Sequence, residues 1–305
     1  MYTKKTTMWC GIETTPGTGV TVTAANAVMA FDVDLSVKAD MKERYPGNDS
    51  RSQYANIRGK TSVDLKFWVE LKGGGVSNAP AWGPLLRACD RLEAVGAGTT
   101  ATYTPALVSE TCTIWVDIDG ITHKLAGCAG DCEIELTAGE VPKLNFTISG
   151  IYVLPTDIPV AAPTFQSTIP VIVKGTTTTF GSYAAIIEKM SLKFGNSVVE
   201  RSSMNAAEGI LSFIVGNRSP AGLMTCEAVL RAATNADFWS YFDAGTTKAL
   251  SLALGSVAGN ICTITAPACK LGAPKYGDRD GLRTFDIEFQ MARSTGNDEI
   301  TIAIT

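Results

Sequence analysis

Three cysteines and the single histidine of this chain are residue types that bind zinc. Cys128 and Cys132 are separated by three residues, and Cys112 and His123 precede them. A structural zinc site needs four such ligands held by tight turns. Cys128 and Cys132 instead lie in a segment with the alternation of a strand. We therefore interpret the eight cysteines as small buried apolar groups in a reducing compartment, not as a zinc site or a disulfide framework.

A short acidic segment resembles the first residues of a calcium-binding loop. It reads Asp117-Ile-Asp119-Gly120, but the glutamate and the ligand spacing of an EF-hand do not follow. Asp-Gly is also a favoured pair in two-residue hairpin turns, because both residues tolerate positive φ there. A hairpin turn explains the run fully, so we predict no calcium site.

Two pairs of carboxylates alternate along candidate strands: Glu133 with Glu135, and Asp286 with Glu288. Side chains two residues apart on a strand project from the same sheet face. Neighbours on one strand cannot bracket a sugar as the acid and base of a glycosidase must. We predict a solvated sheet face and no catalytic residue.

Other catalytic and binding classes lack their signatures. The sequence contains no Gly-x-Ser-x-Gly elbow, no Walker loop and no dinucleotide fingerprint, and one histidine leaves little for a catalytic triad. We expect no cofactor, and a β-rich hydrolase remains a rival without a visible site. The net charge of −4 argues against a dedicated nucleic-acid binder. No apolar run reaches about 18 residues or resembles a secretory signal, so we expect neither a membrane helix nor export.

The elements that must position these residues are mostly strands. Residues 63–71 alternate apolar with polar side chains, and residues 114–118 and 121–125 flank the Asp-Gly turn. Antiparallel β-structure with short turns is the predicted class. Further candidate strands cover residues 132–136, 144–153, 211–215, 223–230, 250–254, 261–265 and 284–291.

Each half of the chain also carries one predicted short helix. Residues 80–92 place five apolar side chains on one face at spacings of three and four residues. Residues 235–245 begin at Asn235, a good N-cap, and end at Gly245. The apolar face of the first helix consists of Trp82, Leu85, Leu86, Cys89 and Leu92.

The order of these elements predicts an internal duplication. In both halves a long strand, a helix, a hairpin and two further strands follow one another. Cys132 and Phe146 are 14 positions apart, and Cys269 and Phe285 are 16 apart, which a two-residue turn insertion would reconcile. We predict two tandem β-sandwich or half-barrel domains, residues 1–157 and 158–305, joined by the proline-rich residues 154–163.

Acidic residues concentrate in the first half. Residues 1–157 hold 14 basic and 18 acidic residues, whereas residues 158–305 hold 12 of each. Such a cluster is typical of a solubilising surface, and it would also repel a polyanion so that DNA passes without sticking. The candidate acidic face comprises Asp131, Glu133, Glu135, Asp286 and Glu288.

One long polar connection, residues 44–58, precedes the strand at residues 63–71, and residues 196–205 are its counterpart in the second half. Loops of this length in compact domains are often functional, although a flexible surface loop is the simpler alternative. Arginines here would pair with carboxylates across a subunit boundary. The candidate inter-subunit residues are Arg44, Arg51, Tyr54 and Arg58.

Taken in order, several short segments resemble the tail tube (major tail) proteins of long-tailed bacteriophages. The resemblance spans most of the chain, and the order of the segments carries it. The segments are Gly11-Ile-Glu-Thr-Thr-Pro-Gly17, residues 63–71, Ala79-Pro-Ala-Trp-Gly-Pro-Leu-Leu-Arg-Ala-Cys89, Thr102-Tyr-Thr-Pro105, Asp119-Gly-Ile-Thr-His-Lys-Leu125, Gly150-Ile-Tyr152, Thr265-Ala-Pro267 and Gly296-Asn-Asp-Glu-Ile300.

The resemblance implies a structural virion protein, assembled in the host cytoplasm, whose rings stack into a hollow tube that delivers DNA. Its partners would be itself, the tape measure, terminator and baseplate or tip proteins, and DNA passing without sequence-specific contacts. Family members usually carry one domain and form hexameric rings. The duplication predicts trimeric rings with pseudo-sixfold symmetry, and the alternative is a hexamer with the second domain outside.

Rival functions remain open at this point. A tail terminator or baseplate ring would share the fold. A carbohydrate-binding β-sandwich would expose aromatic residues, whereas the tryptophans here lie in strand or helix patterns that predict packing. Those tryptophans are Trp68, Trp82, Trp115 and Trp239.

Overall fold

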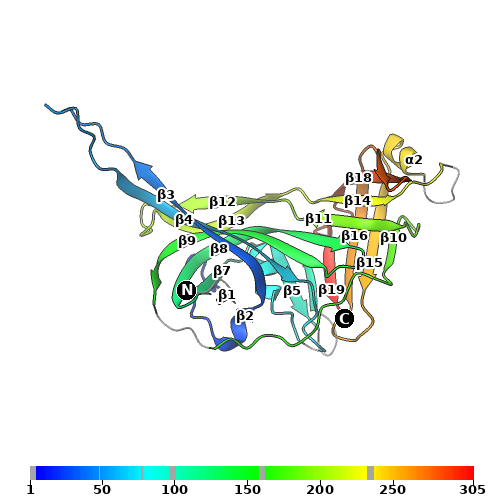
Figure 1. The fold of residues 1–305 in the computed structure, drawn as a ribbon, viewed down its shortest axis with the longest axis horizontal. Helices are drawn as coiled ribbons and strands as arrows, with labels where there is room; N and C mark the ends of the chain where they lie inside the picture. Colours follow the sequence, from blue (N-terminus) through cyan, green and yellow to red (C-terminus); the bar gives the residue numbers. More distant parts are fainter. Residues whose placement is uncertain (1–4, 48, 77, 97–100, 158–161, 232–236) are drawn as a thin grey trace.

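The computed structural model describes residues 5–47, 49–76, 78–96, 101–157, 162–231 and 237–305 (Figure 1). Over these residues the chain forms nineteen strands, two short α-helices and one 3-10 turn. All strand ladders there are antiparallel, so the mainly β class is confirmed. Seventeen strands belong to one continuous hydrogen-bonded sheet system, and β12 and β13 pair separately.

The first half of the chain contains nine strands, one helix and the 3-10 turn Ala24–Asn26. The helix is α1 (Gly83–Ala88), which packs against β1, β5, β7 and β8. The strands are β1 (Thr6–Ile12), β2 (Ala27–Val28), β3 (Ala30–Lys42), β4 (Ile57–Glu70), β5 (Arg91–Val95), β6 (Ala101–Pro105), β7 (Cys112–Ile118), β8 (Ile121–Thr137) and β9 (Lys143–Thr156).

The second half contains the other ten strands and one helix. The helix is α2 (Phe238–Asp243), whose Asp237 side chain accepts a hydrogen bond from the Ser240 amide at its N-cap. The strands are β10 (Thr177–Phe180), β11 (Ile187–Lys193), β12 (Asn196–Ser202), β13 (Ile210–Arg218), β14 (Ala221–Glu227), β15 (Thr247–Leu254), β16 (Cys262–Leu271), β17 (Lys275–Arg279), β18 (Leu282–Ala292) and β19 (Thr301–Ile304).

The two halves repeat one strand order. In the first half neighbouring strands run β1-β7-β8-β9-β4-β3. In the second half they run β10-β15-β16-β18-β14-β11, with the same sequence order of the corresponding elements. In each half the helix follows the inner strand of the long hairpin, β4 or β14. The division into domains at residue 157 stays a prediction.

Two ladders join the halves. Residues 133–137 of β8 pair with residues 189–193 of β11, and β6 pairs with the C-terminal strand β19. One hydrophobic core also runs through both halves and includes Ile134 and Phe146 together with Leu192 and Ile287. The halves therefore share both a sheet and a core.

The hairpin predicted around the Asp-Gly turn is confirmed. Asp119 and Gly120 have φ of 48° and 104°, the positive values that this turn requires. The next predicted strand, residues 132–136, is not separate, because β8 continues unbroken from Ile121 to Thr137. A bulge between Ala126 and Ala129, with Gly127 at φ 57°, bends this long strand where side chains are small.

Both predicted helices form, but they are shorter than the patterns indicated. Cys89 ends α1, Asp90 adopts φ 63°, and the chain continues as β5. Leu92, predicted on the buried helix face, is 58% exposed, whereas Trp82 and Leu85 are buried as predicted. The second helix ends before Gly245 (φ 61°), and its expected N-cap, Asn235, lies outside the described residues.

The strand pairs of the second half also differ from those that the cysteine–phenylalanine spacing predicted. Cys132 faces Phe146 across β8 and β9, but Cys269 faces Met291, and Phe285 faces Tyr276 of β17. The longer spacing between Cys269 and Phe285 therefore comes from the interruption between β16 and β17, not from a longer turn. Residues 196–202, expected as a loop, are strand β12.

Candidate functional site: a polar sheet face and two long hairpins

One sheet crosses both halves in the order β3-β4-β9-β8-β11-β14-β18-β17, and its two faces differ in chemistry. Side chains such as Ile134, Leu192 and Ile287 point into the core. Their neighbours along each strand point the other way, because strand side chains alternate. These neighbours form what we call the polar face, which includes all five carboxylates of the predicted acidic face.

Three of the predicted carboxylates lie at the joint between the halves. Glu135 forms an ion pair with Lys189 of β11 at 2.9 Å, and Glu133 accepts a hydrogen bond from the Ser191 hydroxyl. Asp131 accepts a hydrogen bond from the backbone amide of Asn196 at 3.0 Å. The Lys189 ammonium holds the pKa of Glu135 below its usual value, whereas burial raises the pKa of Asp131.

The other two carboxylates lie on β18. Asp286 accepts a hydrogen bond from the Thr225 hydroxyl at 2.7 Å, and Glu288 pairs with Lys275 at 2.7 Å. The lysine lowers the pKa of Glu288. The structure therefore brings all five predicted carboxylates onto one face.

Lysines balance much of this acidity. Lys38, next to Asp64, and Lys193, 3.9 Å from Asp131, also lie on the polar face. The sequence analysis missed these partners because neither β3, which carries Lys38, nor β11, which carries Lys193, was predicted. The alternation of Met190 and Leu192 with Lys189 and Lys193 was the available signal.

The predicted inter-subunit residues lie on the hairpin formed by β3 and β4, whose distal end projects beyond the rest of the molecule (Figure 1). We call residues 37–47 and 49–60 the projecting hairpin. Arg44 lies 5.9 Å from the ring centroid of Tyr54. Arg58 forms a bidentate pair with Glu208 of the same chain at 2.7 and 2.8 Å. Arg51 is exposed at the hairpin end.

The corresponding hairpin of the second half, β12–β13, lies on the first half. Its Ile210, Phe213 and Val215 pack on Ala129 and Ile151 in a small separate core. Ion pairs join the same surfaces, including one between Lys60 and Glu200 at 2.7 Å.

Two glycines of the first half allow the backbone of the β12–β13 hairpin to approach. A Cβ atom at Gly17 would lie 1.8 Å from the Leu211 carbonyl oxygen, and one at Gly127 would lie 3.0 Å from the Ser212 Cα. Both glycines also have positive φ, 83° and 57°. Close backbone contact therefore fixes where this hairpin lies.

The cysteines are buried, and none forms a disulfide. Cys112 and Cys128 are partners across β7 and β8, and burial raises the pKa of Cys128 and of nearby Cys10. Within the described residues, no group of three His, Cys, Asp or Glu side chains is arranged to hold a metal ion. Of the four tryptophans expected to pack, Trp82 is fully buried and Trp68, Trp115 and Trp239 are half-buried.

A model of the phage tail tube protein family matches residues 3–291, nearly the whole chain. The chain belongs to this family. A search of curated proteins finds no match to it.

As a tail tube protein, the chain is a structural component of the virion tail that associates with itself and with other tail proteins. The family is structural rather than enzymatic. Among the described residues, neither six-residue helix approaches the length needed to cross a bilayer.

Proposed function

We propose that three copies of this chain form a ring that presents six related halves, and that the rings stack into the tube through which phage DNA is delivered. The β8–β11 joint is the observation that carries this proposal. Within one chain, the outer strand of the second half already extends the sheet of the first. Repeating the same joint between copies would close a ring.

Two unpaired sheet edges support this arrangement. Within the described residues, β3 pairs only with β4, and β17 pairs only with β18. In the repeated strand order β3 takes the place of β11. Tyr276 of β17 faces Phe285 as Cys132 of β8 faces Phe146, so β17 takes the place of the end of β8. We infer that β3 of one copy pairs with β17 of the next, which covers both edges.

The polar face is the candidate lining of the lumen. Its opposite face is buried in the core, and the β12–β13 hairpin covers Ala129 and Ile151 on this face, so the uncovered remainder is the part free to meet DNA. Because lysines neutralise part of its carboxylates, the face would neither bind a polyanion by counterion release nor present an uninterrupted negative barrier. Such a surface lets DNA slide.

Ring stoichiometry tests the assembly. Purified protein is concentrated, its rings are counted by native mass spectrometry, and tubes are sought by negative-stain electron microscopy. Three chains per ring and long tubes of uniform diameter are expected. Rings of six chains would refute the trimer and favour the arrangement with the second half outside. Single rings that never stack would point to a terminator or baseplate role, and a persistent monomer would refute the assembly altogether.

Charge reversal tests the lumen. Glu133 and Glu135 touch the β8–β11 joint within one chain, so their reversal to lysine reports on that joint rather than on the lumen alone. Asp286→Lys changes the polar face away from the joint, and Asp243→Lys on α2 is the matched control with the same charge change. We expect normal tubes from both, with slower and more salt-dependent DNA ejection only from Asp286→Lys. Equal ejection by the two variants would remove Asp286 from the lumen.

A further inference from the structure

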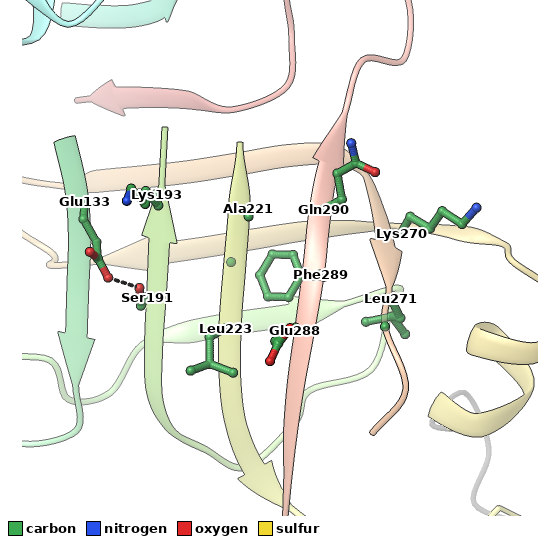
Figure 2. Close-up of a pocket in the computed structure, with 12 residues that line it drawn as sticks. Glu133, Ser191, Lys193, Ala221, Leu223, Lys270, Leu271, Glu288, Phe289 and Gln290 are labelled. Carbon is green, nitrogen blue, oxygen red and sulfur yellow. Dashed lines mark hydrogen bonds between the residues drawn. The ribbon is translucent and has the colours of Figure 1, made fainter. Parts of the chain in front are cut away.

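A shallow groove of about 550 Å³ crosses the polar face of the second half (Figure 2). Strands β14 and β18 form its floor, and beneath that floor, on the core side, a Cβ atom at Gly222 would lie 2.3 Å from the buried ring of Phe289. Ala221 and Leu223 line it on β14, beside Gln290 of β18, and Leu223 is 40% exposed. The groove is therefore an open surface with apolar side chains at its centre.

The corresponding place on the first half is covered. Ile151 lies five residues after Phe146 on β9, as Gln290 lies five residues after Phe285 on β18. Ile151 is buried under Phe213 of the β12–β13 hairpin. The covering hairpin follows directly from β11, the strand that joins the halves. The joint and the covering hairpin thus come from one continuous segment.

The projecting hairpin is the counterpart of the β12–β13 hairpin. Leu65 of β4 faces Ile148 of β9, and Met224 of β14 faces Ile287 of β18, so Leu65 and Met224 hold equivalent places. Tyr54 precedes Leu65 by eleven residues, as Phe213 precedes Met224.

Apolar side chains on the projecting hairpin are left in solvent. Each of five is between 42% and 76% exposed: Val37, Met41, Tyr45, Tyr54 and Ile57. Isolated exposed apolar residues are ordinary, but five on one projecting segment indicate a surface that becomes covered.

We propose that the projecting hairpin of one copy lies in the groove of the second half of the neighbouring copy in the same ring. This inference rests on the proposed ring, in which β3 of that copy pairs with β17. Since the hairpin continues from β3, the same pairing brings it across β16 and β18 toward Ala221, as β12–β13 crosses β8 and β9. Tyr54 then covers Gln290 and Leu223, as Phe213 covers Ile151.

The proposal distinguishes a contact within a ring from a contact between stacked rings. The β12–β13 hairpin lies on the half whose sheet its own strand extends. By the same geometry, the projecting hairpin lies next to the proposed pairing of its own β3 with β17 of the neighbouring copy. The contact therefore forms within a single ring, before rings stack.

Photo-cross-linking locates the contact. A benzoylphenylalanine at Tyr54 keeps an aromatic side chain, and mixing unlabelled with ¹⁵N-labelled chains separates links between copies from links within a copy. In isolated single rings, we expect links between copies to residues 219–224, 268–273 and 286–291. Links to other segments in intact three-chain rings would overturn the inference and leave the proposed function standing. Links that appear only in stacked tubes would also overturn it.

A groove variant gives an independent measurement. Leu223→Arg places a long charged side chain in the groove, and Leu107→Arg, at an 86% exposed position, is the matched control. We expect Leu223→Arg to raise the concentration for half-maximal ring formation about tenfold or more, with unchanged monomer melting temperature. An unchanged ring equilibrium would contradict the proposal. Wild-type protein that forms no rings at all would refute the proposed function as well.

Discussion

Glu13 offers a sharp test of how the first half supports the β12–β13 hairpin. Its carboxylate is 6% exposed and accepts four hydrogen bonds. Two come from the hydroxyls of Thr111 and Thr113 at 2.7 Å, and two from the amides of Gly17 and Gly127 at 2.8 Å. Both glycines touch the β12–β13 hairpin, so one side chain holds the surface on which that hairpin lies.

The substitution Glu13→Ala removes the acceptor for all four donors. A hydrogen bond to a charged group contributes about 1.5–3 kcal/mol, and each donor left buried without a partner carries a similar cost. The four are neighbours, so their losses do not add, and the loop beside Gly17 can admit water. We expect Glu13→Ala to lower the free energy of unfolding by about 3–5 kcal/mol. Glu13→Gln should lose about half as much, because its amide retains one accepting oxygen.

Thermal unfolding of the dilute protein, followed by tryptophan fluorescence, measures the effect. About 3–5 kcal/mol corresponds to a fall of roughly 5–10 °C in Tm for a chain of this size. Glu110→Ala is the control, since Glu110 pairs with Arg87 at 2.6 Å on a partly exposed surface and should contribute under about 1 kcal/mol. If Glu13→Ala and Glu110→Ala melt within 2 °C of each other, the reasoning about Glu13 is wrong.

Three further predictions concern the joint and its surroundings. Arg91 is 1% exposed, its guanidinium nitrogens have no hydrogen-bond partner, and it stacks 3.8 Å from the Phe194 centroid. Burial lowers its pKa to about 10, so Arg91→Met should raise stability by about 1–3 kcal/mol in calorimetry. Because the hydrogen bond from Lys189 lowers the pKa of Glu135, their pair stabilises the joint while that carboxylate is ionised and weakens as the pH falls through its lowered pKa. The protection of β11 amides, corrected for the intrinsic pH dependence of exchange, should therefore fall as the pH drops through the lowered pKa of Glu135 in the wild type and change less in Glu135→Gln. Gly127→Ala, at positive φ against the β12–β13 hairpin, should cost about 1–3 kcal/mol in denaturant unfolding.

Each of these has an outcome that contradicts it. A lower Tm for Arg91→Met would mean that the buried charge has a stabilising partner. Identical pH profiles for wild type and Glu135→Gln would remove that pair from the joint. A fully stable Gly127→Ala would show that the hairpin does not need the close backbone approach.

Local patterns predicted much of this fold. The Asp119-Gly120 turn, the alternation along β4 and β18 and the buried side of α1 all depend on neighbours within a few residues, so the sequence displays them directly. The five carboxylates could be assigned to the solvent-facing side of their strands for the same reason. Side chains alternate between the two faces of a strand, whichever strand it pairs with.

Partners distant in the sequence could not be predicted in this way. The helical spacing of residues 80–92 continued to Leu92, but the positive φ of Asp90 redirected the chain into β5, whose place is set by pairing with β6. The β8–β11 joint links segments about 55 residues apart, and no local pattern records that choice. Of the lysines on the polar face, Lys189 and Lys193 come from β11, Lys38 from β3 and Lys275 from β17, and the sequence patterns predicted none of these strands.

The pairing of β6 with β19 has a consequence for the order in which the chain folds. Residues 101–103 pair with residues some 200 positions later, and Ile302 and Ile304 complete the core there. During synthesis at about 5–20 residues per second, this edge of the first half stays open for roughly 10–40 s after it emerges. A prematurely terminated chain would keep the edge open permanently and expose it to aggregation or degradation. Strand β19 therefore sets when the first half can close, because β6 gains its pairing with β19 only after residues 302–304 are synthesised.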